Sequence, residues 1–234
     1  MSKLIELQRL LPWADWTALA CFFAGWVGYA VFATKRSLRR PSFLASSNRV
    51  RRQWMLQTTF REVRVLDGVV VQQMTSTSSF FASTTILIIG ALLAVLGATE
   101  KASELVREIP FAARTSLLIF DLKVVVLAAI FVYAFFRFTW SIRLYSVGVL
   151  LVAAAPEADV FTDDAQRTSF ADRAGRVMGL AAESFNDGLR AYYMSFAAMA
   201  WFFSPWAMLV VTAGVLLVLY RREFRSAVLR ALEG

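Results

Sequence analysis

The sequence predicts an all-α fold: an integral membrane helical bundle with about four transmembrane helices and a cytoplasmic layer of helix extensions and amphipathic helices. Hydrophobic residues make up 58% of the 234 residues and charged residues 18%, against about 25% charged in soluble domains. The apolar residues form long runs, with 32 uncharged residues between Asp67 and Glu100 and 30 between Arg190 and Arg221. Roughly 20 apolar residues suffice for a helix to cross a bilayer. We therefore expect one membrane domain covering residues 1–234.

Four segments are apolar enough to cross a membrane. The first follows Trp13 and Trp16, whose rings favour headgroup depth, and it ends at the basic cluster KRSLRR. The fourth contains Pro205, and the pattern leaves open whether this proline kinks one span or separates two re-entrant halves. The expected spans are residues 16–34, 77–98, 116–138 and about 195–220.

Lysine and arginine counts predict the orientation of these spans. Loops 35–66 and 141–190 together hold fourteen basic residues, and the opposite side holds nine. Because cytoplasmic loops carry the excess of positive charge, both large loops are expected in the cytoplasm and the N-terminus outside. Four spans also place the C-terminus outside, where the basic segment RREFR disagrees with this rule. A re-entrant pair around Pro205 would move that segment to the cytoplasm and remove the conflict.

The cytoplasmic parts, about 35–76 and 141–190, have the composition of folded helices. In residues 48–66, apolar side chains recur near helical spacing among arginines, which predicts an amphipathic helix. These apolar residues are Val50, Trp54, Phe60 and Val63. The helix could lie on anionic headgroups, where each basic residue gains about 1 kcal/mol, or bind nucleic acid. The net charge of +8 permits the latter, but there is no RNA-binding motif, so we expect lipid headgroups as partners and no nucleic acid.

The rest of the cytoplasmic layer is expected to come from two further helices. Residues 144–156 are too few to span a bilayer and too apolar for water, so the third membrane helix should continue and pack on the basic helix. The segment PEADVFTDD then ends it and supplies acidic N-cap candidates. The next helix has an apolar stripe at helical spacing, formed by Phe170, Ala174, Val177, Ala181 and Phe185.

Missing residue types narrow the chemistry. The chain has no histidine and one cysteine, Cys21, so His-based catalysis, a disulfide within the chain and a thiolate metal cluster are excluded. Phosphate-binding glycine loops and paired carboxylates at catalytic spacing are also missing. We expect no catalytic residue, no metal site, no cofactor and no enzymatic activity.

Three blocks carry a resemblance to a known family. They are SSFFASTTILIIGALLAVLG at 78–97, FVYAFFRFTWSIRLYS at 131–146 and FNDGLRAYYMSFAAMAWFFSPW at 185–206. With their connecting segments they resemble the domain-of-unknown-function 599 family (DUF599) of small bacterial and plant membrane proteins. The resemblance implies a four-span membrane protein, here of a bacterial inner (plasma) membrane. It carries no reaction, substrate or functional residue with it.

The second span is rich in hydroxyl groups. Ser79 and Ser83 lie near one helical face with Gly90, Ala94 and Gly97. One reading is a small-residue seam for close helix packing. The other is a hydroxyl-lined path that would face the shared axis of a homo-oligomer.

The third span holds ionisable residues inside an apolar run. Asp121, Lys123 and Arg137 are costly in a bilayer and indicate function by default, although Lys123 and Arg137 are placed where they could extend to the two membrane surfaces. Asp121 is the better candidate for an intramembrane site. The candidate pathway-lining residues are Ser79, Ser83, Thr84, Asp121 and Lys123.

A second polar cluster lies where the last apolar run begins, around FNDGLRAYY at 185–193. It is either a capped helix entry with an aromatic belt or part of a cytoplasmic vestibule. Arginine forks suit an anion or a lipid phosphate. The candidate binding residues are Arg137, Arg143, Asn186 and Arg190.

Two function classes remain. The first is a homo-oligomeric channel or transport-type protein for an ion or small solute, since four spans alone rarely enclose a path. The alternative is a non-catalytic membrane scaffold or lipid-binding accessory protein that acts through its arginine-rich cytoplasmic layer.

Overall fold

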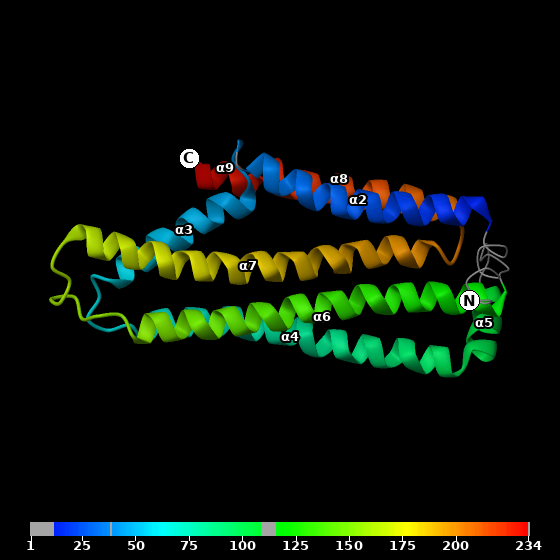
Figure 1. Ribbon diagram of the computed structural model, residues 1–234, viewed down its shortest axis with the longest axis horizontal. Coiled ribbons are helices and arrows are strands. Elements are labelled where there is room, and N and C mark those ends of the chain that lie inside the picture. Colours follow the sequence, from blue (N-terminus) through cyan, green and yellow to red (C-terminus); the bar gives the residue numbers. More distant parts are fainter. Residues whose placement is uncertain (1–11, 38, 109–115, 234) are drawn as a thin grey trace, which may run out of the picture. The chain divides into compact units, whose positions relative to one another are not determined.

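The structure is a computed structural model that describes residues 12–37, 39–108 and 116–233 (Figure 1). Within these residues it contains helices and no strand, which confirms the predicted all-α class. The helices are α2 (Trp13–Ser37), α3 (Phe43–Thr58), α4 (Val65–Gly97), α5 (Thr99–Glu108), α6 (Leu117–Ala153), α7 (Asp164–Ala200), α8 (Pro205–Phe224) and α9 (Ala227–Glu233).

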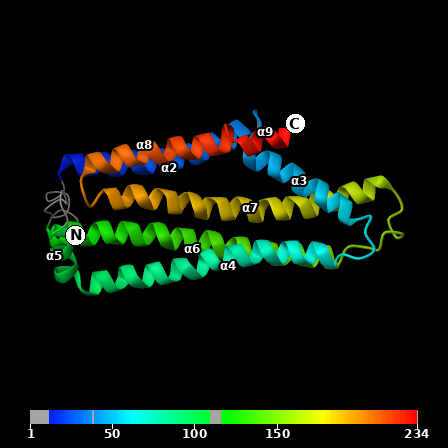
Figure 2. The same ribbon diagram turned by 180° about the vertical axis from the view of Figure 1, so that it is seen from behind.

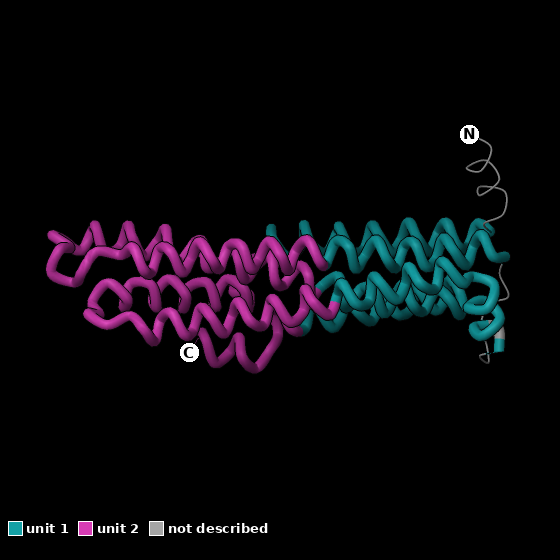
Figure 3. The backbone as a smooth tube through the Cα atoms, turned by 90° about the horizontal axis from the view of Figure 1, so that it is seen from below, with its two compact units in different colours: residues 1–36, 85–134, 190–221 teal, residues 37–84, 135–189, 222–234 magenta. Residues whose placement is uncertain are grey.

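The chain divides into two compact units, coloured separately in Figure 3. Unit 1 comprises residues 1–36, 85–134 and 190–221, and unit 2 comprises residues 37–84, 135–189 and 222–234. Helices α4, α6 and α7 are continuous, and each contributes one segment to either unit.

Three helices, α2, α4 and α6, are long and apolar enough to cross a membrane. They contain nearly all of the first three expected spans, and the chain is therefore a multi-pass membrane protein. Helix α6 continues to Ala153, as the apolar segment 144–156 predicts.

The fourth expected span, about 195–220, is not one helix. Helix α7 ends at Ala200, residues 201–203 form a turn, and Pro205 is the first residue of α8. Proline is favoured at the first helical position. The backbone N–H at this position has no acceptor within the helix, so proline loses no hydrogen bond by lacking it. Pro205 thus begins a helix after a break.

Helix α8 runs parallel to α2 in unit 1 (Figure 2). The ring of Trp13 lies 6.4 Å from that of Trp206, and the ring of Phe32 lies 6.3 Å from that of Tyr220. The N-terminal ends of the two helices therefore contact each other, and so do their C-terminal ends. Helix α7 runs antiparallel to α2, since Asp15 contacts Trp201 while Tyr29 contacts Arg190.

The predicted basic helix over 48–66 is shifted. Helix α3 covers Phe43–Thr58 and begins at the N-cap Ser42, whose hydroxyl accepts a hydrogen bond from the Ala45 N–H. Phe60 and Val63 lie beyond its end, so they do not belong to one helical face with Val50, and Val50 and Val63 are exposed. The helix buries Ser46, Met55 and Thr58 instead. A small and polar face can be buried here because its hydroxyls find hydrogen-bond partners.

The core of unit 2 confirms the stripe predicted in the last cytoplasmic helix. Phe170, Ala174 and Ala181 are buried in a cluster that also contains Met55 of α3 and Tyr145 of α6. The stripe belongs to α7, which runs without interruption from the acidic cap at Asp163 to Ala200.

Candidate functional site

The hydroxyl groups of α4 that form contacts lie one residue away from the predicted face. Ser78 is fully buried and lies 3.2 Å from the Ser141 hydroxyl in unit 2, and the buried Thr85 lies 2.7 Å from the Tyr192 hydroxyl in unit 1. Ser79 is half-buried and Ser83 is exposed, while the Thr84 hydroxyl bonds back to the Phe80 carbonyl at 2.9 Å. One residue turns a helix by about 100°.

The face with Ser83 is therefore outward. Gly90, Ala94 and Gly97 are exposed on it, and a Cβ atom added at either glycine would meet none of the described residues within 4 Å. Any close packing on this face needs a partner other than the described residues of this chain.

Lys123 is buried in unit 1 and does not extend to a membrane surface as expected. Only 2% of its side chain is exposed. Its ammonium group donates to the Trp201 carbonyl at 2.8 Å and lies 5.3 Å from the Trp201 ring centroid. The Trp201 indole N–H in turn donates to the buried Asp15 carboxylate at 2.6 Å. A carbonyl just past the end of α7 and an aromatic face together satisfy the cation.

Asp121 does not pair with Lys123. Its carboxylate accepts a hydrogen bond from the Thr99 hydroxyl at 2.7 Å. Two residues along a helix point to nearly opposite faces, so the two charges serve different contacts. The sequence did not single out Asp15, because it lies at the start of the first apolar segment, between Trp13 and Trp16, where a charge is not unusual.

The four residues expected to form an anion vestibule have separate surroundings. Arg137 forms an ion pair with Asp187 at 2.5 Å, and Arg143 is exposed. The Arg190 guanidinium lies 5.7 Å from the Tyr29 ring centroid in unit 1. Asn186 lines a partly open cavity of unit 2.

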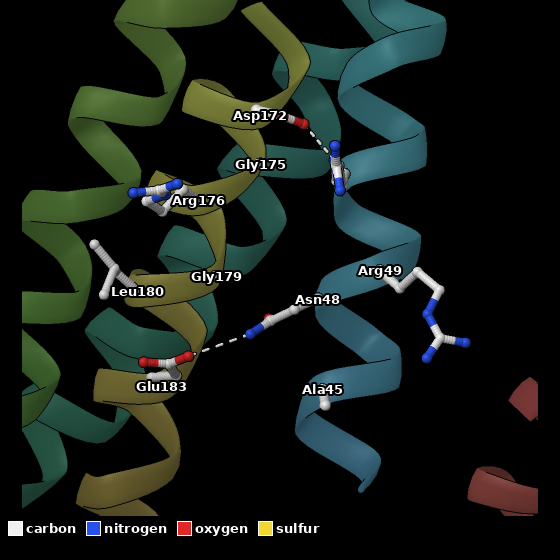
Figure 4. A pocket seen from close by; sticks show the side chains of 10 residues that line it. Ala45, Asn48, Arg49, Asp172, Gly175, Arg176, Gly179, Leu180 and Glu183 are labelled. Atoms are coloured by element: carbon white, nitrogen blue, oxygen red, sulfur yellow. Dashed lines mark hydrogen bonds and ion pairs between the residues drawn. The ribbon is translucent and has the colours of Figure 1, made fainter. Parts of the chain in front are cut away.

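A groove of about 450 Å³ runs between α3 and α7 in unit 2 (Figure 4). A Cβ atom at Gly175 would lie 2.9 Å from the Arg52 Cα, so glycine is what lets the two helices approach. Arg52 pairs with Asp172, and Asn48 donates to Glu183 at 3.2 Å. Because these polar groups bond across the groove, they hold α3 on α7.

Helix α3 meets α9, in the C-terminal segment of unit 2 (Figure 1). The Leu44 N–H donates to the Glu223 carboxylate at 3.2 Å, and Glu233 accepts from Ser46 and pairs with Arg49 at 3.5 Å. We call the exposed arginines of these segments the basic corner. It consists of Arg39, Arg40, Arg222, Arg225 and Arg230.

The ends of α2 and α8 in unit 1 are also basic and adjacent. The Arg36 guanidinium donates to the Tyr220 hydroxyl at 3.5 Å and lies 5.7 Å from its ring centroid. Lys35 and Arg221 flank this contact in the sequence. The conflict raised by RREFR was the sequence signal that pointed to this arrangement.

Comparisons with known proteins give a family and no activity. The family model described as "Protein of unknown function, DUF599" matches residues 17–228. No curated protein and no solved structure matches the chain.

Proposed function

Because the chain belongs to the DUF599 family, whose description states no activity, we propose from the geometry that it is a non-catalytic membrane accessory protein that binds anionic phospholipid headgroups through the basic corner. The observation that carries this proposal is the parallel packing of α2 and α8. Because α8 packs parallel to α2, which is long and apolar enough to cross a membrane, the basic segments that follow the two helices leave the pair at the same end.

The charge distribution supports the same assignment. Placing the C-terminus with the large loops moves four arginines from the side with nine basic residues to the side with fourteen. This removes the conflict with the positive-inside rule. We therefore assign the basic corner to the cytoplasmic surface, for which a bacterial inner membrane is the proposed location.

The chemistry of the basic corner suits phosphate. Guanidinium groups bind phosphate oxygens through paired donors, and each basic residue near an anionic surface gains about 1 kcal/mol. Glu223 and Glu233 lie nearby, but both are bonded to α3. They hold the segment in place while the arginines stay exposed.

Lipid titration of the full chain tests this function. The delipidated protein is titrated with phosphatidylglycerol and with phosphatidylcholine of the same acyl chains, and bound lipids are counted by native mass spectrometry. We expect the R39Q/R40Q variant to lose most of the preference for phosphatidylglycerol. The matched control is R173Q/R176Q, which removes the same charge from exposed positions of α7 in unit 2.

The two variants decide the result together. An equal loss of preference in both would show an unspecific charge effect, and an unchanged preference in R39Q/R40Q would show that the basic corner binds no lipid. Either outcome rejects the proposed function.

A second candidate function is the homo-oligomeric channel. The outward small-residue face of α4, with Ser83, Gly90 and Gly97, favours it because another copy could pack closely there. We expect G90L then to break the oligomer and to abolish solute flux into proteoliposomes. A monomeric wild-type preparation with the flux of empty vesicles would reject this candidate.

A further inference from the structure

Unit 2 contains a second cavity, distinct from the groove in Figure 4. Its volume is about 250 Å³, or about eight water molecules at roughly 30 Å³ each. Helices α3, α4, α6 and α7 all contribute to its wall. Its lining includes Phe43, Ser47, Arg51, Met74, Tyr145 and Asn186.

The cavity has one charged group in its wall. Arg51 is the only lysine, arginine or carboxylate side chain among the described lining residues. Its Nε atom is buried, and none of the described residues accepts a hydrogen bond from it. Its Nη1 atom donates to the Asn48 side chain at 2.9 Å. A buried donor without an acceptor is costly, and more so on a charged group.

The carboxylate that acts electrostatically on Arg51 is bonded to another residue. Glu183 acts electrostatically on Arg51, but it accepts from Asn48 and lines the α3–α7 groove instead. Burial is the main effect on Arg51 and lowers the pKa of its guanidinium. An anion in the cavity would stabilise the charged form of Arg51, which burial destabilises.

Further donors face the same space. Tyr145 is 4% exposed, and its hydroxyl has no hydrogen bond to a described residue. The side chains of Ser47 and Asn186 also line the cavity, and neither has a hydrogen bond to another described residue. The neighbouring hydroxyl groups of Thr77 and Ser78 differ, because they bond to the Gln73 carbonyl and to Ser141.

The remaining wall is apolar. Phe43 and Leu44 of α3, Met74 of α4 and Phe185 of α7 contribute it. A cavity with converging donors at one cation and aromatic or aliphatic walls is typical of a small-molecule site.

We propose that this cavity binds a small organic anion, a carboxylate or phosphate monoester with a compact apolar body. Arg51 pairs with the anionic oxygens, Tyr145 and Asn186 donate hydrogen bonds to them, and Phe43, Met74 and Phe185 enclose the apolar body. The ligand is a separate class from the bilayer lipids of the proposed function, since the cavity holds about 250 Å³.

Fluorine NMR of the full chain in detergent micelles tests this site. The probes are 4-fluorobenzoate, 4-fluorophenyl phosphate and the neutral 4-fluorobenzyl alcohol, each compared with protein-free micelles. We expect saturable line broadening for one or both anions and none beyond the micelle reference for the alcohol. The stronger anion identifies the carboxylate or the phosphate class. Equal broadening by the alcohol, or none by either anion, overturns the proposal.

Variants place the binding in the cavity. We expect Arg51→Gln to raise the Kd of the stronger anion roughly tenfold to a hundredfold, as for a lost charged hydrogen bond, and Tyr145→Phe to raise it about fivefold. Tyr145→Phe removes one hydroxyl and keeps the ring, so it tests the site even if Arg51→Gln fails to fold. Arg143→Gln is the control, because Arg143 lies on α6 two residues before Tyr145 and its side chain is exposed.

The outcomes separate this site from the basic corner. Unchanged affinity in Arg51→Gln and Tyr145→Phe overturns the cavity, as does an equal loss in Arg143→Gln. The R39Q/R40Q variant should keep the anion affinity whatever its lipid preference.

Discussion

The two units satisfy their charges in different ways. In unit 2, carboxylates meet arginines, as in the pairs Arg61–Asp67, Arg52–Asp172 and Arg137–Asp187. In unit 1, Lys123 meets a backbone carbonyl and aromatic rings, and Asp15 meets an indole N–H. Unit 1 contains much of the three apolar helices. Each of these ion pairs has at least one partly exposed side chain, where water lowers the cost of charge, while the apolar part uses dipoles and rings.

Unit 2 also has arginines that bond to backbone carbonyls, as Lys123 does in unit 1. In unit 2, Arg64 donates to the Ala155 carbonyl at 2.6 Å, and Arg167 donates to the Thr59 carbonyl at 2.5 Å. These arginines connect loops that are far apart in the sequence. Some arginines of unit 2 thus stabilise its fold, while others are exposed on its surface.

The largest expected effect concerns the buried carboxylate of unit 2. Asp67 accepts from the Trp54 indole at 2.6 Å and pairs with Arg61. We expect Asp67→Ala to lower the free energy of unfolding by about 3 kcal/mol, since a buried indole N–H and a cation lose their acceptor. SDS-induced unfolding in mixed micelles measures this change. Asp159 is exposed, so Asp159→Ala should change stability by less than about 0.5 kcal/mol. An equal loss of stability in Asp67→Ala and Asp159→Ala would show that the contacts of Asp67 do not stabilise unit 2.

A medium effect is expected from two glycines. Gly175 of unit 2 packs against the Arg52 backbone, whereas Gly90 of unit 1 meets none of the described residues within 4 Å. Gly175→Ala should cost about 2 kcal/mol through overpacking, and Gly90→Ala should be neutral or stabilising by up to about 1 kcal/mol because alanine favours a helix. Both are measured by the same unfolding assay. A destabilising Gly90→Ala would mean that the outward face of α4 is covered.

The smallest effect is expected at Lys123. The side chain is buried, and its ammonium bonds to the Trp201 carbonyl rather than to a carboxylate. Because the partner is a neutral carbonyl, Lys123→Met removes the desolvation cost of a buried charge and leaves no unpaired charge behind. We therefore expect it to change stability by about 1 kcal/mol or less. A loss as large as that of Asp67→Ala would show that the two units do not differ in this respect.

The sequence predicted elements well and contacts poorly. The stripe of Phe170, Ala174 and Ala181 and the extension of α6 were predictable because helical periodicity and apolar length are local properties. The sequence did not predict which hydroxyl group of α4 bonds within the chain, since Ser78 and Ser79 are the same residue type and only the partner Ser141 distinguishes them. Asn186 was singled out, but Arg51 was not, because one arginine among many gives no sign that it faces a cavity.

The sequence by itself determined that this is an all-helical membrane protein, because long uncharged runs can be satisfied only in a bilayer. It also determined the family, through blocks that span most of the chain. Tertiary structure alone decided that Pro205 begins a helix parallel to α2, that Lys123 is enclosed by Trp201, and that Arg51 faces a cavity. The physical reason is that burial and hydrogen-bond partners come from residues distant in the sequence, whereas helix formation and hydrophobicity come from neighbours.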